Sequence, residues 1–310
     1  MSRLGLVVNP AAGRGRGAAA GRRTHALLAA AGHDVHDLSA PTLARATDRA
    51  RAAVLAGVDA LVVVGGDGMV HLGADVLAGT GVPLGVVPVG TGNDVARAVG
   101  LPRADVDGAV AAVLAGLGDG PVALDAVRVG PPGGPVREWY AGVLSCGLDA
   151  AVNARANTLR WPHGTARYVR ALVPELARFR PYGYRVTLDD GVWESGGTLV
   201  AVANTAWFGG GLRIAPGADP TDGLLDVVLA GPFTRAGAVG IFPGLYHGRH
   251  VRDPRVRVVR SRRVVVEPRA DLGPPPPPAF ADGERIGPLP LVAEVVPGAL
   301  SLLGARTAAT

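Results

Sequence analysis

Short apolar runs rich in valine and leucine alternate with longer alanine- and leucine-containing segments along the first 120 residues. Buried parallel strands are predicted at 4–9, 35–39, 61–64 and 83–89. Helices are predicted at 14–31 and 42–56, with Gly32 and Gly57 at their ends. Strands and helices that alternate through short glycine turns are typical of a parallel sheet covered by helices on both faces. We therefore predict an α/β domain over residues 1–122.

The pattern changes after about residue 121, where strand-like runs follow one another. Strands are predicted at 122–129, 138–146, 184–188, 198–204, 224–229, 256–259 and 264–267. Only 153–180 and 234–247 have the length and composition of helices, and the proline run 274–278 predicts a loop. Runs of strands indicate a second, mainly antiparallel domain over residues 123–297. The segment 298–310 is a candidate to pack back onto the first domain.

Composition limits the chemistry that this chain can perform. Of its 310 residues 48% are hydrophobic, but glycines interrupt the long uncharged stretches 76–93 and 195–212, so no membrane span is predicted. All 31 basic residues are arginine, which excludes a phosphate-binding, Schiff-base or general-base lysine. The single cysteine, Cys146, excludes a disulfide framework and is expected in the core. We expect a cytoplasmic protein without a signal peptide.

Glycine-rich turns follow the first, third and fourth predicted strands, at residues 9–13, 65–68 and 88–94. Carboxyl ends of parallel strands are where open α/β sheets bind ligands. Glycines let the backbone approach a phosphate, amides at helix starts point toward it, and Arg14 adds positive charge. Asp67 in the second turn is a hard oxygen ligand suited to Mg²⁺.

Each glycine turn alone is a weak signal, because glycine is abundant in this chain. The combination favours nucleotide phosphate with a metal ion over ordinary turns. A dinucleotide site is disfavoured, because no Gly-x-Gly-x-x-Gly follows the first strand. His71, just after the second turn, is expected on a helix surface rather than as a ligand.

The three turns resemble the N-terminal motifs of the diacylglycerol kinase catalytic domain family, which includes bacterial diacylglycerol kinases, sphingosine kinases and related lipid kinases. They are Asn9-Pro-x-x-Gly13, Gly65-Gly-Asp-Gly68 and Gly90-Thr-Gly-Asn-Asp94. Segments 208–216, 222–226, 281–284 and 296–300 also match the family, in the right order. The resemblance spans nearly the whole chain. It implies an α/β nucleotide domain, a β-sandwich lipid-substrate domain and an active site in the cleft between them.

The resemblance also assigns roles to residues. It places the nucleotide against Asn9, Pro10, Gly13, Arg14, Ser39, Gly65, Gly66, Asp67, Gly68, Gly90, Thr91, Gly92 and Asn93. Glu284 of the Asp-Gly-Glu motif is the first candidate for the general base, and Asp67 is the second. Phosphoryl transfer depends mainly on positioning and charge neutralisation, so one carboxylate on Mg²⁺ and another near the nucleophile suffice.

Metal sites are likewise implied by the resemblance. Asp67, Asp94 and Asp125 resemble the acidic network around the nucleotide's Mg²⁺, and a structural Mg²⁺ is implied at Asp219, Asp222 and the backbone carbonyl of Leu224. Helix capping or ion pairing remains an alternative for Asp94 and Asp125, and simple turn formation for Asp222-Gly223 and Asp282-Gly283. Met69 stands where the family usually has Thr or Ser, so one hydrogen bond to phosphate is lost, worth roughly 1 kcal/mol.

The function implied is an ATP- and Mg²⁺-dependent lipid kinase of phospholipid biosynthesis, which converts diacylglycerol to phosphatidic acid. The alternatives are an NAD-kinase-like enzyme, which shares the Gly-Gly-Asp-Gly turn, and a non-catalytic nucleotide- or lipid-binding regulator. A lipid acceptor requires peripheral contact with the inner face of an anionic membrane. The arginine-rich stretch 249–263 and the segment 157–180 are candidate contacts, with a solvated strand face as the alternative for the former. No nucleic-acid motif is present, and a homodimer is left open.

Overall fold

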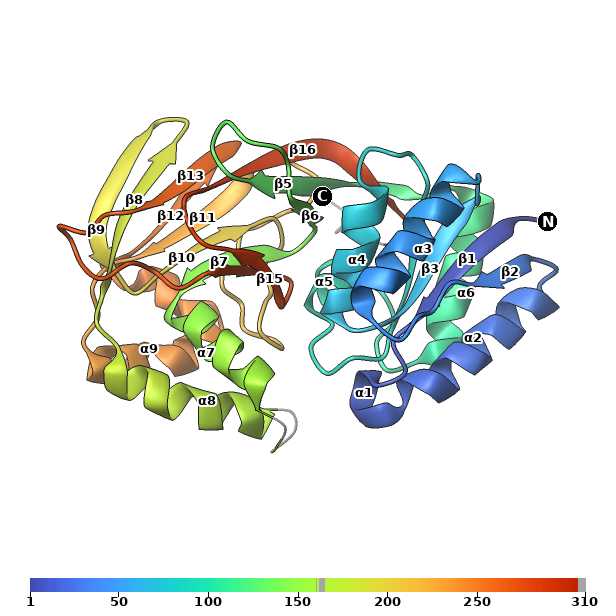
Figure 1. Ribbon diagram of the computed structural model, residues 1–310, viewed down its shortest axis with the longest axis horizontal. Coiled ribbons are helices and arrows are strands. Elements are labelled where there is room, and N and C mark those ends of the chain that lie inside the picture. Colours follow the sequence, from blue (N-terminus) through green and yellow to red (C-terminus); the bar gives the residue numbers. More distant parts are fainter. Residues whose placement is uncertain (160, 162–164, 306–310) are drawn as a thin grey trace. The chain divides into compact units, whose positions relative to one another are not determined.

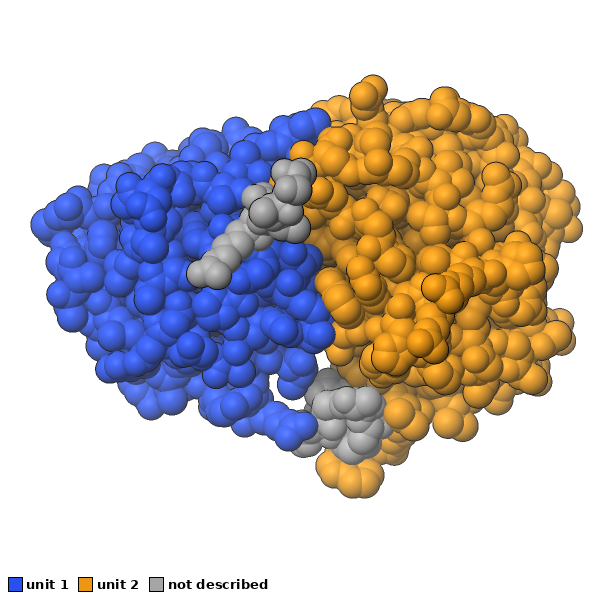
Figure 2. Space-filling model, turned by 180° about the vertical axis from the view of Figure 1, so that it is seen from behind, with its two compact units in different colours: residues 1–126, 296–310 blue, residues 127–295 orange. Residues whose placement is uncertain are grey.

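The computed structural model describes residues 1–159, 161 and 165–305. The chain divides into two compact units, coloured separately in Figure 2. Unit 1 contains residues 1–126 and 296–310, and unit 2 contains residues 127–295. Of the segment 298–310, residues 306–310 lie outside the described residues.

Unit 1 is built on a parallel sheet in the order β2-β1-β3-β4. Its strands are β1 (Arg3–Val8), β2 (Asp34–Asp37), β3 (Ala60–Gly65) and β4 (Leu84–Pro88). The end of β16 (Leu291–Leu302) extends the sheet, pairing in parallel with β4 at Leu302 and Leu84. The predicted strand-helix alternation and parallel sheet are confirmed.

Helices cover both faces of this sheet, as Figure 1 shows. On one face, α2 (Gly17–Ala30) and α6 (Val106–Asp119) pack on a cluster of valines and leucines from β1, β3 and β4. On the other lie α3 (Leu43–Leu55) and α4 (Asp67–Leu77), while the short α5 (Asp94–Ala98) follows β4. The side chains of Thr42 and Asp105 cap α3 and α6 by accepting backbone N–H bonds, which places both helix starts.

Unit 2 is a sandwich of two antiparallel sheets. One has the order β12-β11-β10-β7-β14-β15. Its strands are β7 (Val143–Gly147), β10 (Leu199–Ala203), β11 (Leu225–Ala230), β12 (Val256–Ser261), β14 (Ala279–Ala281) and β15 (Glu284–Gly287). In the other, β16 pairs with β13 (Arg263–Pro268), which pairs with β8 (Tyr182–Leu188) and then β9 (Gly191–Gly197). Strand β5 (Val122–Gly130) pairs with β6 (Glu138–Tyr140).

The core of unit 2 lies between these sheets and consists of alternate residues of the facing strands. Tyr140 and Tyr184 are fully buried there, and their hydroxyls donate to the carbonyls of Val202 and Cys146 at 3.2 and 2.7 Å. The predicted antiparallel second domain and the buried Cys146 are confirmed.

Helices cover the outside of the sandwich. Helix α9 (Arg235–Leu245), followed by the 3₁₀ turn η1 (Arg249–Arg252), packs on the outer face of β7, β10 and β11. Helices α7 (Leu148–Thr158) and α8 (Thr165–Arg178) form a smaller cluster closed by Phe179. No helix in the described part of the chain has the length and apolar character needed to cross a bilayer.

Several sequence predictions are corrected. The single helix at 153–180 is wrong, because α7 and α8 are separate, and part of the segment between them (160, 162–164) lies outside the described residues. The strand at 138–146 is divided by a turn at Ala141-Gly142. Strands β9, β14, β15 and β16 were not predicted, since glycines weaken the first and Pro297-Gly298 interrupts the apolar pattern of the last.

Candidate active site

The first glycine turn leaves β1 at Asn9, whose N–H donates to the carbonyl of Val64 on β3 at 3.0 Å. Its side-chain oxygen accepts from the Ala11 N–H at 3.1 Å, which starts the turn. The following element α1 (Ala12–Gly15) is not regular helix, since Gly13 and Arg14 both have left-handed backbones, with φ of 60° and 62°. A non-glycine residue in this region is uncommon and strained, so Arg14 is held there by its surroundings.

The three glycine turns are in contact with one another. A Cβ atom at Gly13 would lie 2.3 Å from the carbonyl oxygen of Val89, and one at Gly90 would lie 2.4 Å from the Cα of Gly66. These distances are too short for any side chain, so glycine is required for the backbones to meet. The structure therefore brings the predicted turns together at the carboxyl ends of β1, β3 and β4.

Asp67 and Asn93 hold the second and third turns together. The Oδ1 atom of Asp67 accepts from the N–H groups of Asp94 and Val95, at 2.6 and 3.3 Å, and so satisfies the start of α5. Asn93 is left-handed (φ 54°), and its amide donates to the carbonyl of Gly90 at 3.0 Å. Of this third turn, Thr91 is exposed whereas Asn93 is buried. The side chains of Asp67 and Asn93 thus hold the third turn in place.

Asp94 and Asp125 are buried, with 4% and 2% of each residue exposed. The Oδ1 atom of Asp125 accepts from the N–H of Gly298 at 2.9 Å, which ties β5 to the Val-Pro-Gly segment of β16. Among the described residues no group of three or more acidic, histidine or cysteine side chains could hold a metal ion by itself. The side chains of Asp94 and Asp125 offer hard carboxylate oxygens, the ligand type that Mg²⁺ takes from one or two protein carboxylates together with substrate phosphates.

Helix α4 is buried along nearly all of its length, which corrects one expectation. His71 is only 4% exposed, so its predicted place on the helix surface is wrong. Met69 is also buried, and its side chain covers Gly65, where an added Cβ would lie 2.2 Å from the Met69 Cγ. Met69 therefore acts here as a packing residue that fixes the second glycine turn.

The Asp-Gly-Glu motif forms the turn between β14 and β15. Asp282 is left-handed (φ 51°), and its carboxylate accepts from three successive N–H groups, of Ala141, Gly142 and Val143, at 3.0–3.1 Å. A carboxylate that takes three backbone donors fixes its own turn. Asp282 thereby sets the position of Glu284, the first residue of β15, which is partly exposed.

Two asparagines that the motifs did not single out bond to the Asp-Gly-Glu turn or to the Ala141 segment that Asp282 contacts. The buried Asn204, just after β10, donates from its amide to the carbonyl of Ala141 at 2.8 Å. Asn153 on α7 donates to the carbonyl of Gly283 at 3.3 Å. A polar residue directly after an apolar strand was the available signal for Asn204, whereas nothing local marks Asn153.

The loop implied to bind a structural Mg²⁺ contacts the side chain of Arg260 on β12. Asp219 accepts from the N–H and hydroxyl of Thr221, and the Oδ1 of Asp222 accepts from the N–H of Leu224 at 3.0 Å. The other oxygen of Asp222 is ion-paired with Arg260, whose Nε lies 3.8 Å from the carboxylate of Asp226. Burial raises the pKa of the Asp226 carboxyl. In the structure Asp222 and Asp226 face a guanidinium and do not form the cage of oxygen ligands that a bound Mg²⁺ requires.

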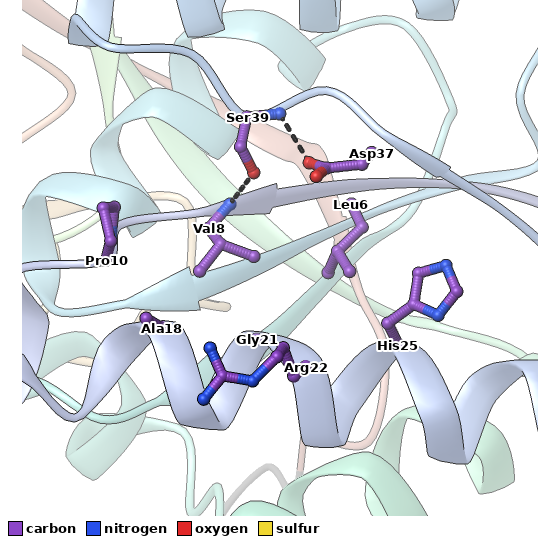
Figure 3. Close-up of a pocket in the computed structure, with 9 residues that line it drawn as sticks. All are labelled: Leu6, Val8, Pro10, Ala18, Gly21, Arg22, His25, Asp37 and Ser39. Atoms are coloured by element: carbon purple, nitrogen blue, oxygen red, sulfur yellow. Dashed lines mark hydrogen bonds between the residues drawn. The ribbon is translucent and has the colours of Figure 1, made fainter.

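Ser39 lies beside a cavity of about 370 Å³ within unit 1, shown in Figure 3. Its hydroxyl accepts from the N–H of Val8 at 2.9 Å, which joins the end of β2 to β1. Leu6 and Val8 point from the sheet toward α2, and Arg22 and His25 project from α2 (Figure 3). The lining residues are Leu6, Val8, Pro10, Ala18, Gly21, Arg22, His25, Asp37 and Ser39. Two predicted nucleotide residues, Pro10 and Ser39, therefore share one cavity large enough for a small ligand.

Burial is the main cause of the raised pKa values of the titratable groups in the core of unit 2. It raises the pKa of the Cys146 thiol and of the Tyr184 hydroxyl, and with nearby Glu175 and Asp149 it raises the pKa of Tyr182 to about 12. These groups stay protonated at neutral pH, which agrees with structural roles.

Comparison with known proteins relates this arrangement to other chains. Residues 3–126 match the model of the diacylglycerol kinase catalytic domain, and residues 142–304 match that of the YegS C-terminal NAD kinase beta sandwich-like domain. A diacylglycerol kinase of Mycobacterium tuberculosis (strain CDC 1551 / Oshkosh) is 38% identical over 309 residues, 99% of this chain and 96% of that protein. The chain belongs to the diacylglycerol kinase catalytic domain family.

A further relative agrees with this membership, and a solved structure shows the same fold. The diacylglycerol kinase of Bacillus subtilis (strain 168) is 25% identical over 86% of each chain. A crystal structure of a diacylglycerol kinase from Bacillus anthracis str. Sterne has the same fold, with a TM-score of 0.73 at 23% identity over 97% of this chain and 96% of that one. The resemblance and the fold class predicted from the motifs are confirmed, and the chain is a member of a family of lipid kinases.

Proposed function

We propose that this protein is an ATP-dependent lipid kinase that transfers the γ-phosphate to a lipid hydroxyl, with diacylglycerol as the first acceptor and phosphatidic acid as product. The observation that carries the proposal is the contact between the three glycine turns, where only glycine fits at Gly13 and Gly90. Backbone amides concentrated at strand ends and helix starts form a site for phosphates. The near-full-length likeness to a diacylglycerol kinase supports the choice of acceptor.

We place the triphosphate at the three turns and the nucleoside in the cavity beside Pro10 and Ser39. Leu6 and Val8 offer an apolar wall for a base, while Asp37, Arg22 and Ser39 offer polar atoms for a ribose. Ala18→Leu would narrow this cavity from its α2 side, and we expect weaker ATP binding without loss of the fold. Unchanged ATP affinity in calorimetry would exclude the cavity as the nucleoside site.

Glu284 is our proposed general base. Its carboxylate would accept the proton of the lipid hydroxyl while that oxygen bonds to the γ-phosphorus and ADP leaves. Its support is the rigid turn before it, which Asp282 fixes through three backbone N–H groups. Asp67, the second candidate, already uses one oxygen to hold α5. A bound Mg²⁺ would neutralise phosphate charge, with Asp67, Asp94 and Asp125 as the nearest protein carboxylates in our scheme.

The base assignment is tested with Glu284→Gln, which keeps the shape of the side chain and removes its basicity. We expect kcat to fall by about 100-fold or more while the Kd for ATP stays unchanged. Asp190→Asn, at an exposed turn between β8 and β9, is the control for loss of one negative charge. Near-normal turnover of Glu284→Gln would transfer the base role to Asp67.

The second candidate function is phosphorylation of NAD, because residues 142–304 match a domain described as NAD kinase beta sandwich-like. An assay with γ-labelled ATP distinguishes the two functions. The acceptors are NAD and, in mixed micelles, diacylglycerol, monoacylglycerol and a sphingoid base. Label on NAD and on none of the lipids would favour the second function. ATP binding without label on any acceptor would indicate a regulator without turnover.

A further inference from the structure

Helix α9 is apolar on all sides. Between Arg235 and Arg249 the chain carries no carboxylate and no arginine. Its inner side, through Ala238, Ile241 and Leu245, packs on the outer face of the antiparallel sheet. Helices that are apolar all round belong inside a core or a membrane. Only one side of α9 has a core to face.

The outer side of α9 is uncovered. Val239, Phe242 and Tyr246 are 52%, 36% and 45% exposed, and their spacing of three and four residues places them on one side of the helix. The rings of Phe242 and Tyr246 meet edge to face with centroids 5.9 Å apart. We call these three residues the α9 face. Three large apolar side chains grouped on one exposed helix side are typical of an interaction site.

Exposed arginines stand at both ends of the segment that carries the α9 face. Arg235 stands at the start of the helix, and Arg249 and Arg252 follow its end, all exposed. The one nearby acidic residue in sequence, Asp253, is occupied by an ion pair with Arg255 at 2.7 Å. The two ends of the α9 face therefore carry net positive charge, which favours an anionic partner.

Helix α8 lies next to α9 and also exposes apolar side chains. The Nε of Arg235 donates to the carbonyl of Phe179, just after α8, at 3.3 Å, so α8 and α9 lie next to each other, as Figure 1 also shows. Helix α8 exposes Val169 and Val173, at 56% and 64%. The predicted interfacial segment 157–180 overlaps this helix, although residues 160 and 162–164 lie outside the described residues.

We propose that the α9 face docks this protein on an anionic lipid bilayer. The aromatic and aliphatic side chains would enter the headgroup boundary, and the flanking arginines would meet anionic lipids. This rests on the proposed function, because a kinase that modifies a lipid must collect its acceptor from a bilayer. It also revises the role of stretch 249–263, since Arg255 and Arg260 are already ion-paired within the protein whereas Arg249 and Arg252 flank the α9 face.

Binding of the full chain to vesicles tests the proposal without any turnover. The vesicles are phosphatidylcholine alone or phosphatidylcholine with phosphatidylglycerol, and binding is measured by co-sedimentation. We expect Phe242→Gln and Tyr246→Gln each to weaken binding by about tenfold. Leu55→Gln, at an 89% exposed leucine on α3, is the matched control and should bind as the unmodified protein does.

A separate variant tests the arginines that flank the α9 face. Arg249→Gln with Arg252→Gln should weaken binding only to the phosphatidylglycerol vesicles, whereas Arg45→Gln on α3 should have no effect. Equal binding of Phe242→Gln, Tyr246→Gln and the unmodified protein would overturn the proposal. So would a Phe242→Gln variant that changes from dimer to monomer in light scattering while keeping its vesicle binding, because the face would then pack against a second copy.

Kinase assays separate this proposal from the proposed function. We expect Phe242→Gln to lose activity toward diacylglycerol in vesicles and to retain it in detergent mixed micelles. An equal loss in both would overturn the docking role. An unmodified protein that binds anionic vesicles through the α9 face, yet phosphorylates no lipid in micelles, would refute the proposed function alone.

Discussion

Gly90→Ala is the sharpest test of the contact between the second and third glycine turns. The added methyl group would lie 2.4 Å from the Cα of Gly66 and 2.7 Å from the Oδ1 of Asn93. Both neighbours are held in place, Gly66 by the strand before it and Asn93 by its bond to the Gly90 carbonyl. The substitution must therefore move backbone rather than the end of a flexible side chain.

The distances set the size of the effect. Carbon atoms pack at about 3.5–4.0 Å, so the two turns must separate by roughly 1 Å. Overpacking of this kind costs about 1–3 kcal/mol of unfolding free energy. Misplacement of reacting groups by about 1 Å lowers rates by up to about 100-fold. We therefore expect kcat/KM for ATP to fall by about 100-fold, together with a Tm lower by several degrees.

The assay compares ATP affinity, turnover and Tm in three variants. Gly118→Ala on α6 is the matched control, because its added Cβ has no atom within 4 Å, and it should keep full activity and gain about 0.4–1 kcal/mol of stability. Gly66→Ala should be milder than Gly90→Ala, since its Cβ would lie 3.3 Å from the Gly90 Cα. A Gly90→Ala enzyme with unmodified ATP affinity and turnover would refute the idea that these turns hold the phosphates.

Three further predictions concern unit 2. Because Arg260 neutralises Asp222 and Asp226, a chelator should leave the Tm of the unmodified protein unchanged. Arg260→Gln should lower the Tm and make added Mg²⁺ stabilising, and an unmodified protein whose Tm falls with a chelator would contradict this reasoning. Burial lowers the pKa of His250 below its ordinary 6.5, so its folded form binds fewer protons than its unfolded form and stability falls as pH drops below about 6.5. His250→Gln should show a smaller fall in Tm between about pH 7.5 and about pH 5, and an equal fall would exclude His250 as a cause. Cys146 should react with a thiol reagent only after unfolding, since it is fully buried and burial raises the pKa of its thiol; fast native labelling would contradict the packing.

Much of unit 1 could be predicted because its signals are local. Strand β3 is a continuous buried apolar run that includes three successive valines, and the glycine turns after β1, β3 and β4 lie where the motifs place them. Sequence alone did not indicate how these turns meet. The contact of Gly66 with Gly90, and the bond from Asp67 to the start of α5, join segments more than 20 residues apart. Such pairs depend on strand order, which no local pattern contains.

The strands of unit 2 are harder to predict from sequence, because they depend on partner strands that are distant along the chain. Strand β16 contains Pro297 and Gly298, which weaken a strand pattern, yet Asp125 on β5 accepts the Gly298 N–H and stabilises that bend. The turn at Ala141-Gly142 is likewise set by Asp282, about 140 residues away. The motif Asp-Gly-Glu identified Asp282 as a turn residue, but its role in positioning β7 required the fold.

Transfer of labelled γ-phosphate from ATP to diacylglycerol in mixed micelles tests the central claim most directly. We predict that the label appears in a chloroform-soluble product that migrates as phosphatidic acid. We also predict that Glu284→Gln and Gly90→Ala strongly reduce this product, while Asp190→Asn and Gly118→Ala leave it unchanged. Label that stays in the aqueous phase as inorganic phosphate or phosphorylated NAD, with every lipid acceptor unlabelled, would contradict the account.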